Sequence, residues 1–376
     1  MIDLKSNAEK FMSELPYHNE PYCGRNWGHS WHSMCSYHGK LKPAIAHYLI
    51  RNFTKKDDVV FDPMCGVGTI PFEAALQGRI SIGNDLSSLA YFVTKSKIEC
   101  PSLLSSQIEL QNFEDFIAKE ITTIQFNNAP YRDFGLNHSL KEYFHPQTFI
   151  ELLAARKYIK VCSRNLTAEQ ALIISCLLHV LHGNRPYALS RRSHPLTPYA
   201  PSGEYIYKSV AKHVKDKMER VYRDDNFAQF VKGKSLHADF RECDGIMADV
   251  IITSPPFADS MKFYTQNWMR LWMCGWEPID FKNVDARFVD NEQNKNMDVY
   301  IDFFDMCNRN LKSNGFVILH LGMTKKINMA LELVKRADKY FEKVYLGTET
   351  VSAVEKHGIK DKGGTIAHQF LFLRKK

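Results

Sequence analysis

Residues 57–85 constrain the fold more than any other part of this chain. The run DDVVFDP at 57–63 has a β-type pattern closed by Pro63, TIPFEAALQ at 69–77 is typical of a helix, and RISIGND at 79–85 indicates a second strand. A strand, a glycine-bearing turn, a helix and a second strand make a βαβ unit. Such a unit implies a parallel sheet whose ligand lies at the carboxyl ends of the strands.

The pattern of the rest of the chain extends this unit. LKPAIAHYLIRN at 41–52 predicts an amphipathic helix, and β-type runs return at 248–256, 314–322 and 368–375. Between them, residues 101–235 alternate helical pieces with a loop rich in proline, arginine and aromatics. We predict an α/β fold with a mostly parallel twisted sheet, helices on both faces and a helical insertion. The catalytic domain is assigned to 1–100 and 236–376, and the mainly helical insertion to 101–235.

Composition excludes several classes of protein. The nine cysteines are scattered without a CxxC or a zinc-type spacing, so we expect reduced thiols and no metal. No apolar run is long enough to span a bilayer and the first residues lack a signal-peptide core, so we expect a cytoplasmic protein without membrane contact. The net charge of +7 suits a polyanionic partner but does not specify one.

The turn after the first predicted strand suggests a nucleoside site. Gly66 and Gly68 permit a tight turn and close backbone approach, while Pro71 replaces the third glycine of a dinucleotide fingerprint. Asp85 ends the next strand, where a carboxylate can accept hydrogen bonds from ribose hydroxyls. Without a pyrophosphate to hold, this arrangement fits a cationic nucleoside, S-adenosyl-L-methionine. The predicted cofactor residues here are Asp62, Met64, Cys65, Gly66, Gly68, Thr69, Asp85 and Leu86, although turn packing alone is the simpler interpretation for Met64 and Cys65.

The strand at 248–253 ends in Ser254, Pro255, Pro256 and Phe257, which suggest chemistry on an amine. An exocyclic nucleobase amine is a poor nucleophile because its lone pair is delocalised into the ring. A backbone carbonyl and the serine oxygen can hold the amine hydrogens, so that the lone pair points at a methyl group. The prolines fix φ and remove N–H donors, which leaves a rigid turn rich in acceptors. The phenylalanine ring can stack on a base swung out of its helix.

Together DPMCGVGT, GND and TSPPF resemble the amino-directed DNA methyltransferases over 36–100 and about 235–375. The resemblance implies a Rossmann-like class I methyltransferase fold, S-adenosyl-L-methionine as cofactor and double-stranded DNA as substrate, methylated by base flipping and direct transfer. Serine in the first place of the tetrad favours N4 of cytosine over N6 of adenine. Phe257 stands where tyrosine is commoner and keeps the aromatic face. A cognate restriction endonuclease can accompany such an enzyme, but the sequence is silent on one.

Further segments follow from the same resemblance. Lys42 and Pro43 match a segment near the methionine end of the cofactor, with a plain helix start as the alternative. Asp239 would accept from the adenine amino group and Phe240 would pack on the adenine ring, with a solvated turn aspartate as the alternative.

The loop of the insertion supplies candidate nucleic-acid contacts. Its arginines can bridge phosphates or read guanine, and its aromatics can stack on unpaired bases. The alternative is a basic solvated loop. The predicted contacts are Arg185, Tyr187, Arg191, Arg192 and His194, interleaved with Tyr199, Tyr205 and Tyr207.

Two other functions stay open. RNA amino methyltransferases share a DP-x-C-G-x-G turn and a similar tetrad, and DPMCGVGT resembles their turn closely. A non-catalytic nucleic-acid-binding subunit could keep the fold, although the intact turn and tetrad argue against it.

Overall fold

The computed structural model describes residues 3–24, 27–37, 39–194, 198–224, 226–258, 262–284, 286–350 and 364–376. Within these ranges one seven-stranded sheet forms, in the order β3-β2-β1-β4-β5-β7-β6. Its strands are β1 (Val59–Asp62), β2 (Ile80–Asn84), β3 (Lys234–Leu236), β4 (Ala248–Thr253), β5 (Leu311–Thr324), β6 (Phe341–Thr350) and β7 (Thr365–Lys375).

The first five strands of the chain run parallel, and only β7 is reversed. β1 pairs in parallel with β2 and β4, β4 pairs in parallel with β5, and β7 pairs antiparallel with both β5 and β6. The strand order therefore reverses direction between β1 and β4, which is where open α/β sheets bind ligands. This order with a reversed seventh strand is that of a Rossmann-like class I methyltransferase fold.

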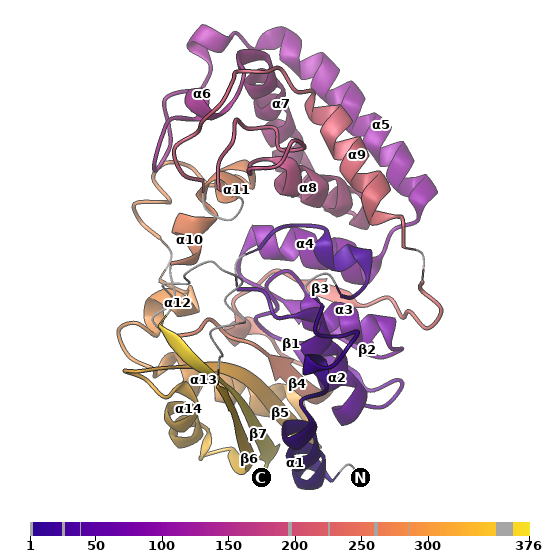
Figure 1. Cartoon of the computed structure of the whole chain (residues 1–376), viewed down its shortest axis with the longest axis vertical. Helices are drawn as coiled ribbons and strands as arrows, with labels where there is room; N and C mark the ends of the chain where they lie inside the picture. The colour runs from indigo at the N-terminus through magenta and orange to yellow at the C-terminus, as the bar shows by residue number, and fades with distance from the viewer. Residues whose placement is uncertain are drawn as a thin grey trace.

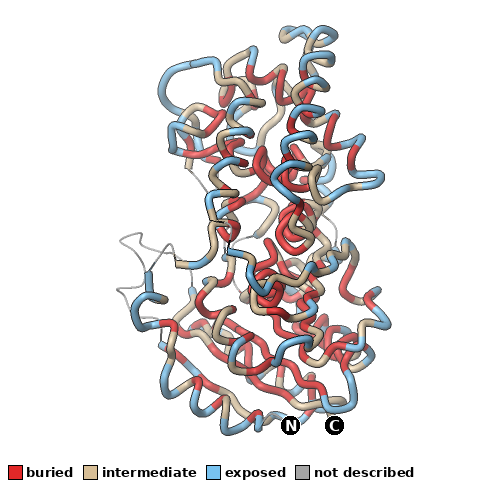
Figure 2. Tube along the Cα trace, turned by 90° about the vertical axis from the view of Figure 1, so that its right-hand side faces the viewer, coloured by how far each residue is buried: buried red, intermediate tan, exposed pale blue. Residues whose placement is uncertain are grey.

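Alternating side chains bury both faces of the sheet. Val60, Val250 and Ile252 pack with α1 (Leu4–Glu14) and α2 (Pro43–Phe53), whereas Phe61 and Ile251 pack with α13 (Val299–Asn310) and α14 (Met329–Ala337). Burial on both faces explains why the sequence of the central strands is almost continuously apolar. Figure 2 shows this as buried tube through the centre of the sheet.

The insertion packs on the sheet domain through α4. α4 (Ser88–Glu99) contacts α8 (Ala168–Val180), and apolar side chains of both helices share one core. In Figure 1 helices α5 to α9 lie above the sheet, far from the chain termini. The remaining helices are α3 (Thr69–Leu76), α5 (Leu103–Glu120), α6 (Leu140–Tyr143), α7 (Pro146–Cys162), α8 (Ala168–Val180), α9 (Val210–Val221), α10 (Phe263–Gln266), α11 (Trp268–Met273) and α12 (Val289–Glu292).

The predicted βαβ unit is confirmed, since β1, α3 and β2 follow one another as expected. Two edge strands, β3 and β6, were not expected from the sequence. No helix in the described parts of the chain is long and apolar enough to cross a membrane.

Candidate active site

The cofactor turn at residues 63–68 and the serine-proline corner at residues 254–257 follow two neighbouring parallel strands. Phe61 pairs with Ile251 in register, so Asp62 at the end of β1 and Ser254 after β4 leave the same edge of the sheet. On the other side of β4, Thr253 pairs with Leu319 of β5. Both predicted motifs therefore lie at the carboxyl edge of the sheet, next to the point where the strand order reverses.

The turn between β1 and α3 requires its glycines. Gly66 and Gly68 have φ of +51° and +68°, in the left-handed region that favours glycine. A Cβ on Gly68 would lie 2.7 Å from Oγ1 of Thr94. That hydroxyl donates to the Gly66 carbonyl at 2.9 Å, and Nζ of Lys97 donates to the Val67 carbonyl at 2.6 Å. α4 thus holds the turn in place with two side chains.

Carboxylates gather beneath this turn. Oδ2 of Asp85 accepts from the Gly66 amide and Oδ1 from the Ser87 amide, each at 2.9 Å, while Asp62 accepts from the Met64 amide at 3.2 Å. Burial raises the pKa of Asp62 to about 7. Burial also raises the pKa of Asp85 to about 6, and the nearby charge of Asp290 in α12 adds to this shift.

These carboxylates fit a cation. Their hydrogen-bond partners within the described chain are backbone amides, which carry no charge. Buried carboxylates without a charged partner resist ionisation, and a bound cation would relieve that cost. A nucleoside with a cationic amino-acid tail therefore matches the two carboxylates at the turn.

Asn84 connects the turn to the segment after β3. Its Nδ2 donates to the Pro63 carbonyl at 3.0 Å and to the Ala238 carbonyl at 3.1 Å, and its Oδ1 accepts from the Ala238 amide at 3.1 Å. The buried Asp239 follows, with Oδ2 at 3.0 Å from Nη1 of Arg241. These contacts bring Asp239 to the strand edge that carries the turn.

Other predicted cofactor residues lie around this edge. The Phe240 ring packs against Phe303, with centroids 6.0 Å apart, and the Leu86 carbonyl lies 3.1 Å from Nε2 of His237. Lys42 is exposed at the N-cap of α2, which starts at Pro43 as the sequence predicts. Met64 is half-buried. Cys65, in the turn, and Thr69, the first residue of α3, are both buried.

The corner after β4 is supported from two sides. Oγ of Ser254 lies 3.0 Å from Nδ1 of His320 on β5. Nε2 of the buried Gln293 donates to the carbonyls of Pro256 and Phe257 at 3.1 and 3.4 Å. The side-chain oxygen of Gln293 accepts from the Tyr300 hydroxyl at 2.9 Å, which fixes the amide orientation.

Phe257 lies over β5 and β7. Its ring centroid is 5.5 Å from that of His320 and 5.9 Å from that of His368. A Cβ on Gly322 would meet the Phe257 ring at 2.5 Å, so glycine makes room for the ring. The ring is half-buried, which leaves part of it accessible.

The predicted nucleic-acid residues divide into exposed and packed side chains. Arg185 and Arg192 are exposed. The guanidinium of Arg191 instead donates to the carbonyls of Gly203 and Glu142 and lies 4.5 Å from the Tyr205 ring centroid. The ring of Tyr187 stacks on His179 at 5.3 Å, and that of His194 packs on Tyr199 at 5.3 Å.

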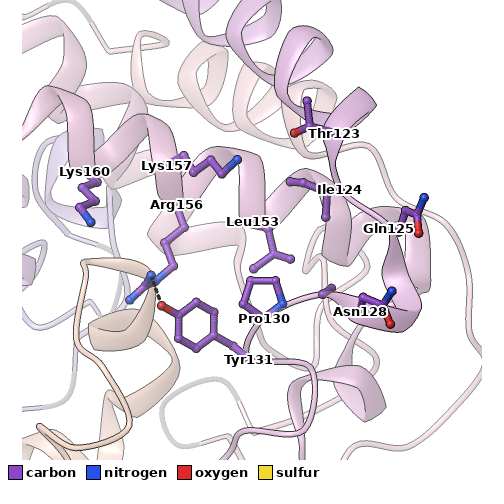
Figure 3. A pocket seen from close by; sticks show the side chains of 11 residues that line it. Thr123, Ile124, Gln125, Asn128, Pro130, Tyr131, Leu153, Arg156, Lys157 and Lys160 are labelled. Atoms are coloured by element: carbon purple, nitrogen blue, oxygen red, sulfur yellow. Dashed lines mark hydrogen bonds between the residues drawn. The ribbon is translucent and has the colours of Figure 1, made fainter.

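A cavity of about 530 Å³ lies in the insertion, lined by residues of α7 and of the loop after α5 (Figure 3). Arg156 points toward Tyr131 there, and its guanidinium also contacts Glu277 at 2.9 Å. Lys157 pairs with Glu120 at 2.9 Å. The cavity is separate from the strand edge, and acidic partners already neutralise two of its cations.

Sequence reasoning missed several residues at the site. Tyr37 covers the turn, since a Cβ on Gly66 would lie 3.5 Å from its ring, and Asp290 accepts from the Phe263 amide at 3.1 Å. His320 and Gln293 hold the corner. Their positions depend on strand register and helix packing, so no local motif marks them.

One family model and several solved structures match this chain. Residues 31–128 match the UPF0020 family model, described as RMKL-like, methyltransferase domain. No curated protein matches the sequence. Among solved structures, TrmN from Thermus thermophilus has 14% identity and a TM-score of 0.33, covering 90% of this chain, which spans only 50% of TrmN.

Two further structures are similarly distant. The rRNA methyltransferase aviRa from Streptomyces viridochromogenes has 8% identity and a TM-score of 0.33. The match covers 90% of this chain and 86% of the aviRa chain. TYW2 from M. jannaschii in complex with AdoMet has 9% identity and a TM-score of 0.33. The match covers 96% of this chain and 85% of the TYW2 chain. Likenesses this distant do not identify a substrate.

The fold is that of a Rossmann-like class I methyltransferase, and residues 31–128 match a methyltransferase domain. S-adenosyl-L-methionine is the cofactor that this fold and the glycine turn with its carboxylates support. Within the described residues, no cluster of three or more metal-ligating side chains forms.

Proposed function

We propose that this methyltransferase acts on an exocyclic amino group of a nucleobase in RNA. The observation that carries the proposal is the position of Ser254-Pro255-Pro256-Phe257, which leaves β4 at the same sheet edge as the turn after β1. A hydroxyl acceptor, rigid carbonyls and a half-exposed aromatic ring meet there. This set of groups suits a planar base that carries an amine.

The chain would act mainly by orienting the amine. The Ser254 oxygen accepts one amine hydrogen and a carbonyl of the corner accepts the other, which turns the lone pair toward the glycine turn. Phe257 offers its ring for stacking on the base. When bound, S-adenosyl-L-methionine would supply a sulfonium methyl group, whose transfer to the amine nitrogen would leave the electron pair of the broken carbon–sulfur bond on sulfur. The methylated amine is acidic enough to release its proton to water without a strong base.

Asp62 and Asp85 would hold the cationic cofactor. Asp85 would accept hydrogen bonds from the ribose hydroxyls, and Asp62 would face the cationic tail. Asp239 is the candidate partner of the adenine amino group, and Lys42 that of the cofactor carboxylate. We expect Arg185 and Arg192, which are exposed, to contact phosphates of the nucleic acid.

Two features favour RNA over duplex DNA. The DPMCGVG turn resembles that of RNA amino methyltransferases. The insertion exposes the aromatic side chains of Tyr199, Tyr205 and Tyr207 on a loop. RNA is read mostly through unpaired bases that stack on such side chains, whereas duplex DNA is read by an element inserted in the major groove.

Duplex DNA methylated at N4 of cytosine remains the second candidate. The observation that favours it is the serine in the first place of the tetrad, which the amino-directed DNA methyltransferases associate with cytosine. The comparisons give this narrower assignment no support of their own.

One labelling experiment tests both candidates. Purified full-length protein is incubated with tritiated S-adenosyl-L-methionine and either total RNA or duplex DNA, beside a Ser254→Ala variant. We expect label in RNA, a large loss of turnover in the variant and unchanged cofactor binding. Digestion to nucleosides then identifies the methylated amine. Label in DNA alone would replace the proposal by the second candidate, and label in neither polymer would refute both.

A further inference from the structure

The hydrogen bond between Ser254 and His320 links the corner to the neighbouring strand. Oγ of Ser254 and Nδ1 of His320 are 3.0 Å apart, and the imidazole is 4% exposed. Because Thr253 pairs with Leu319 in parallel register, Ser254, directly after β4, comes to lie beside His320 of β5. The contact therefore follows from the sheet register.

A serine hydroxyl can donate or accept, so its direction must be set before it can hold an amine hydrogen. If the hydroxyl donates its own hydrogen to a neighbour, its oxygen keeps its lone pairs for the substrate. We propose that His320 is a positioning residue that accepts the Ser254 hydroxyl hydrogen at Nδ1 and so makes the serine oxygen an acceptor for the substrate amine. This inference rests on the proposed function and adds a residue to it.

The surroundings of the imidazole favour this hydrogen-bond direction. Three aromatic rings, those of Phe257, His368 and Phe370, surround it with centroids 5.0 to 5.5 Å away. Its Nε2 is buried without a hydrogen-bond partner among the described residues. An N–H can point at an aromatic face, whereas a nitrogen lone pair is repelled by it. We therefore place the ring hydrogen on Nε2, which leaves Nδ1 as the acceptor.

The charge state of His320 agrees with this role. Burial, together with the nearby charges of His368 and Lys42, holds the pKa of the imidazole well below its ordinary value. A neutral imidazole has one bare nitrogen, whereas a protonated one has two donors and could not accept from the serine.

A double-mutant cycle tests whether His320 acts through Ser254. His320→Phe keeps an aromatic ring and removes the acceptor, whereas His320→Asn restores an acceptor near the position of Nδ1. We expect His320→Phe to lower kcat about tenfold, the value of one hydrogen bond, with little change in the KM for the cofactor. His320→Asn should recover most of this loss. In the Ser254→Ala background His320→Phe should cost less than about twofold, because its target is already gone.

Equal losses in the two backgrounds would overturn the proposal and assign His320 a packing role. Unfolding curves of each variant show whether the fold is intact, and the asparagine variant keeps the test valid if the phenylalanine variant does not fold.

A second measurement needs no activity, so it stands even if the proposed function fails. The full chain is labelled with nitrogen-15 at histidine, and the ring of His320 is identified by its loss in His320→Asn. We expect a hydrogen on Nε2, a bare Nδ1, and a Nδ1 signal that moves in Ser254→Ala. A hydrogen on Nδ1, or a Nδ1 signal that ignores the serine substitution, would refute the inference whatever the enzyme methylates.

Discussion

Replacing Gly68 by alanine tests how tightly α4 constrains the cofactor turn. The residue has φ of +68°, where an alanine costs about 1–2 kcal/mol relative to glycine. The new Cβ would lie 2.7 Å from Oγ1 and 3.1 Å from Cγ2 of Thr94. That hydroxyl is fixed by its bond to the Gly66 carbonyl, so it cannot rotate away freely. Overpacking of this kind costs a further ~1–3 kcal/mol.

We therefore expect Gly68→Ala to lower the free energy of unfolding by about 2–5 kcal/mol. Gly245 provides the matched control, because its φ is +71° and a Cβ there meets nothing within 4 Å. Gly245→Ala should cost only the ~1–2 kcal/mol of backbone strain. Urea unfolding followed by circular dichroism gives both values, and calorimetric titration gives cofactor affinity. Affinity should fall in Gly68→Ala only.

Adding Thr94→Ala to Gly68→Ala removes the two side-chain atoms that clash and should recover part of the stability. Equal destabilisation by Gly68→Ala and Gly245→Ala, or an unchanged cofactor affinity in Gly68→Ala, would refute the packing of the turn described here.

Four further predictions concern residues at the strand edge. Cofactor affinity should rise with pH through about 6 to 7, since a cation binds ionised Asp62 and Asp85, and Asp62→Asn should flatten this dependence in calorimetric titrations. The free protein should show the opposite trend in unfolding curves: the pKa of about 7 for Asp62 lies above its ordinary 3.8, so the folded state binds more protons and stability falls between these pH values. Gln293→Leu removes the donor to two corner carbonyls; methyl transfer should drop about tenfold with cofactor affinity unchanged, and a parallel loss of affinity would contradict its assignment to the corner. Asn84→Leu leaves buried partners unsatisfied and should lower the free energy of unfolding in urea by about 2–4 kcal/mol, so a loss below ~1 kcal/mol would argue against the link between the turn and the segment after β3.

Local patterns were enough to predict the centre of this fold. The runs that became β1, β4 and β5 are apolar because both of their faces are buried, and Gly66 and Gly68 mark the turn because left-handed backbone favours glycine. The edge strands β3 and β6 escaped prediction because their residues are largely polar and partly exposed.

The supports of the site could not be predicted for a different reason. His320 is an ordinary residue in a β-type run, and only the register of β5 against β4 places it beside Ser254. Gln293 and Asp290 belong to a polar stretch of the sequence, and they reach the corner and the turn because the segment around α12 folds back onto the sheet edge. Side chains that act through tertiary packing leave no spacing signal in one sequence.

Electrostatics and packing assign different tasks to the two halves of the site. Buried carboxylates beneath the turn favour a cation, and neutral groups around Ser254 leave acceptors for an amine. Because the two halves follow adjacent strands, the proposed positions of the cofactor methyl group and the base lie next to each other. The proposed function depends on this adjacency.

A crystal structure of the full chain with bound S-adenosyl-L-methionine tests it most directly. An attacking nitrogen sits ~3 Å from the methyl carbon and about 3 Å from its acceptor, so we expect the methyl carbon within about 6 Å of Oγ of Ser254, with the ribose on Asp85. A cofactor bound away from the β1 turn, or one whose sulfonium faces away from Ser254, would contradict the account.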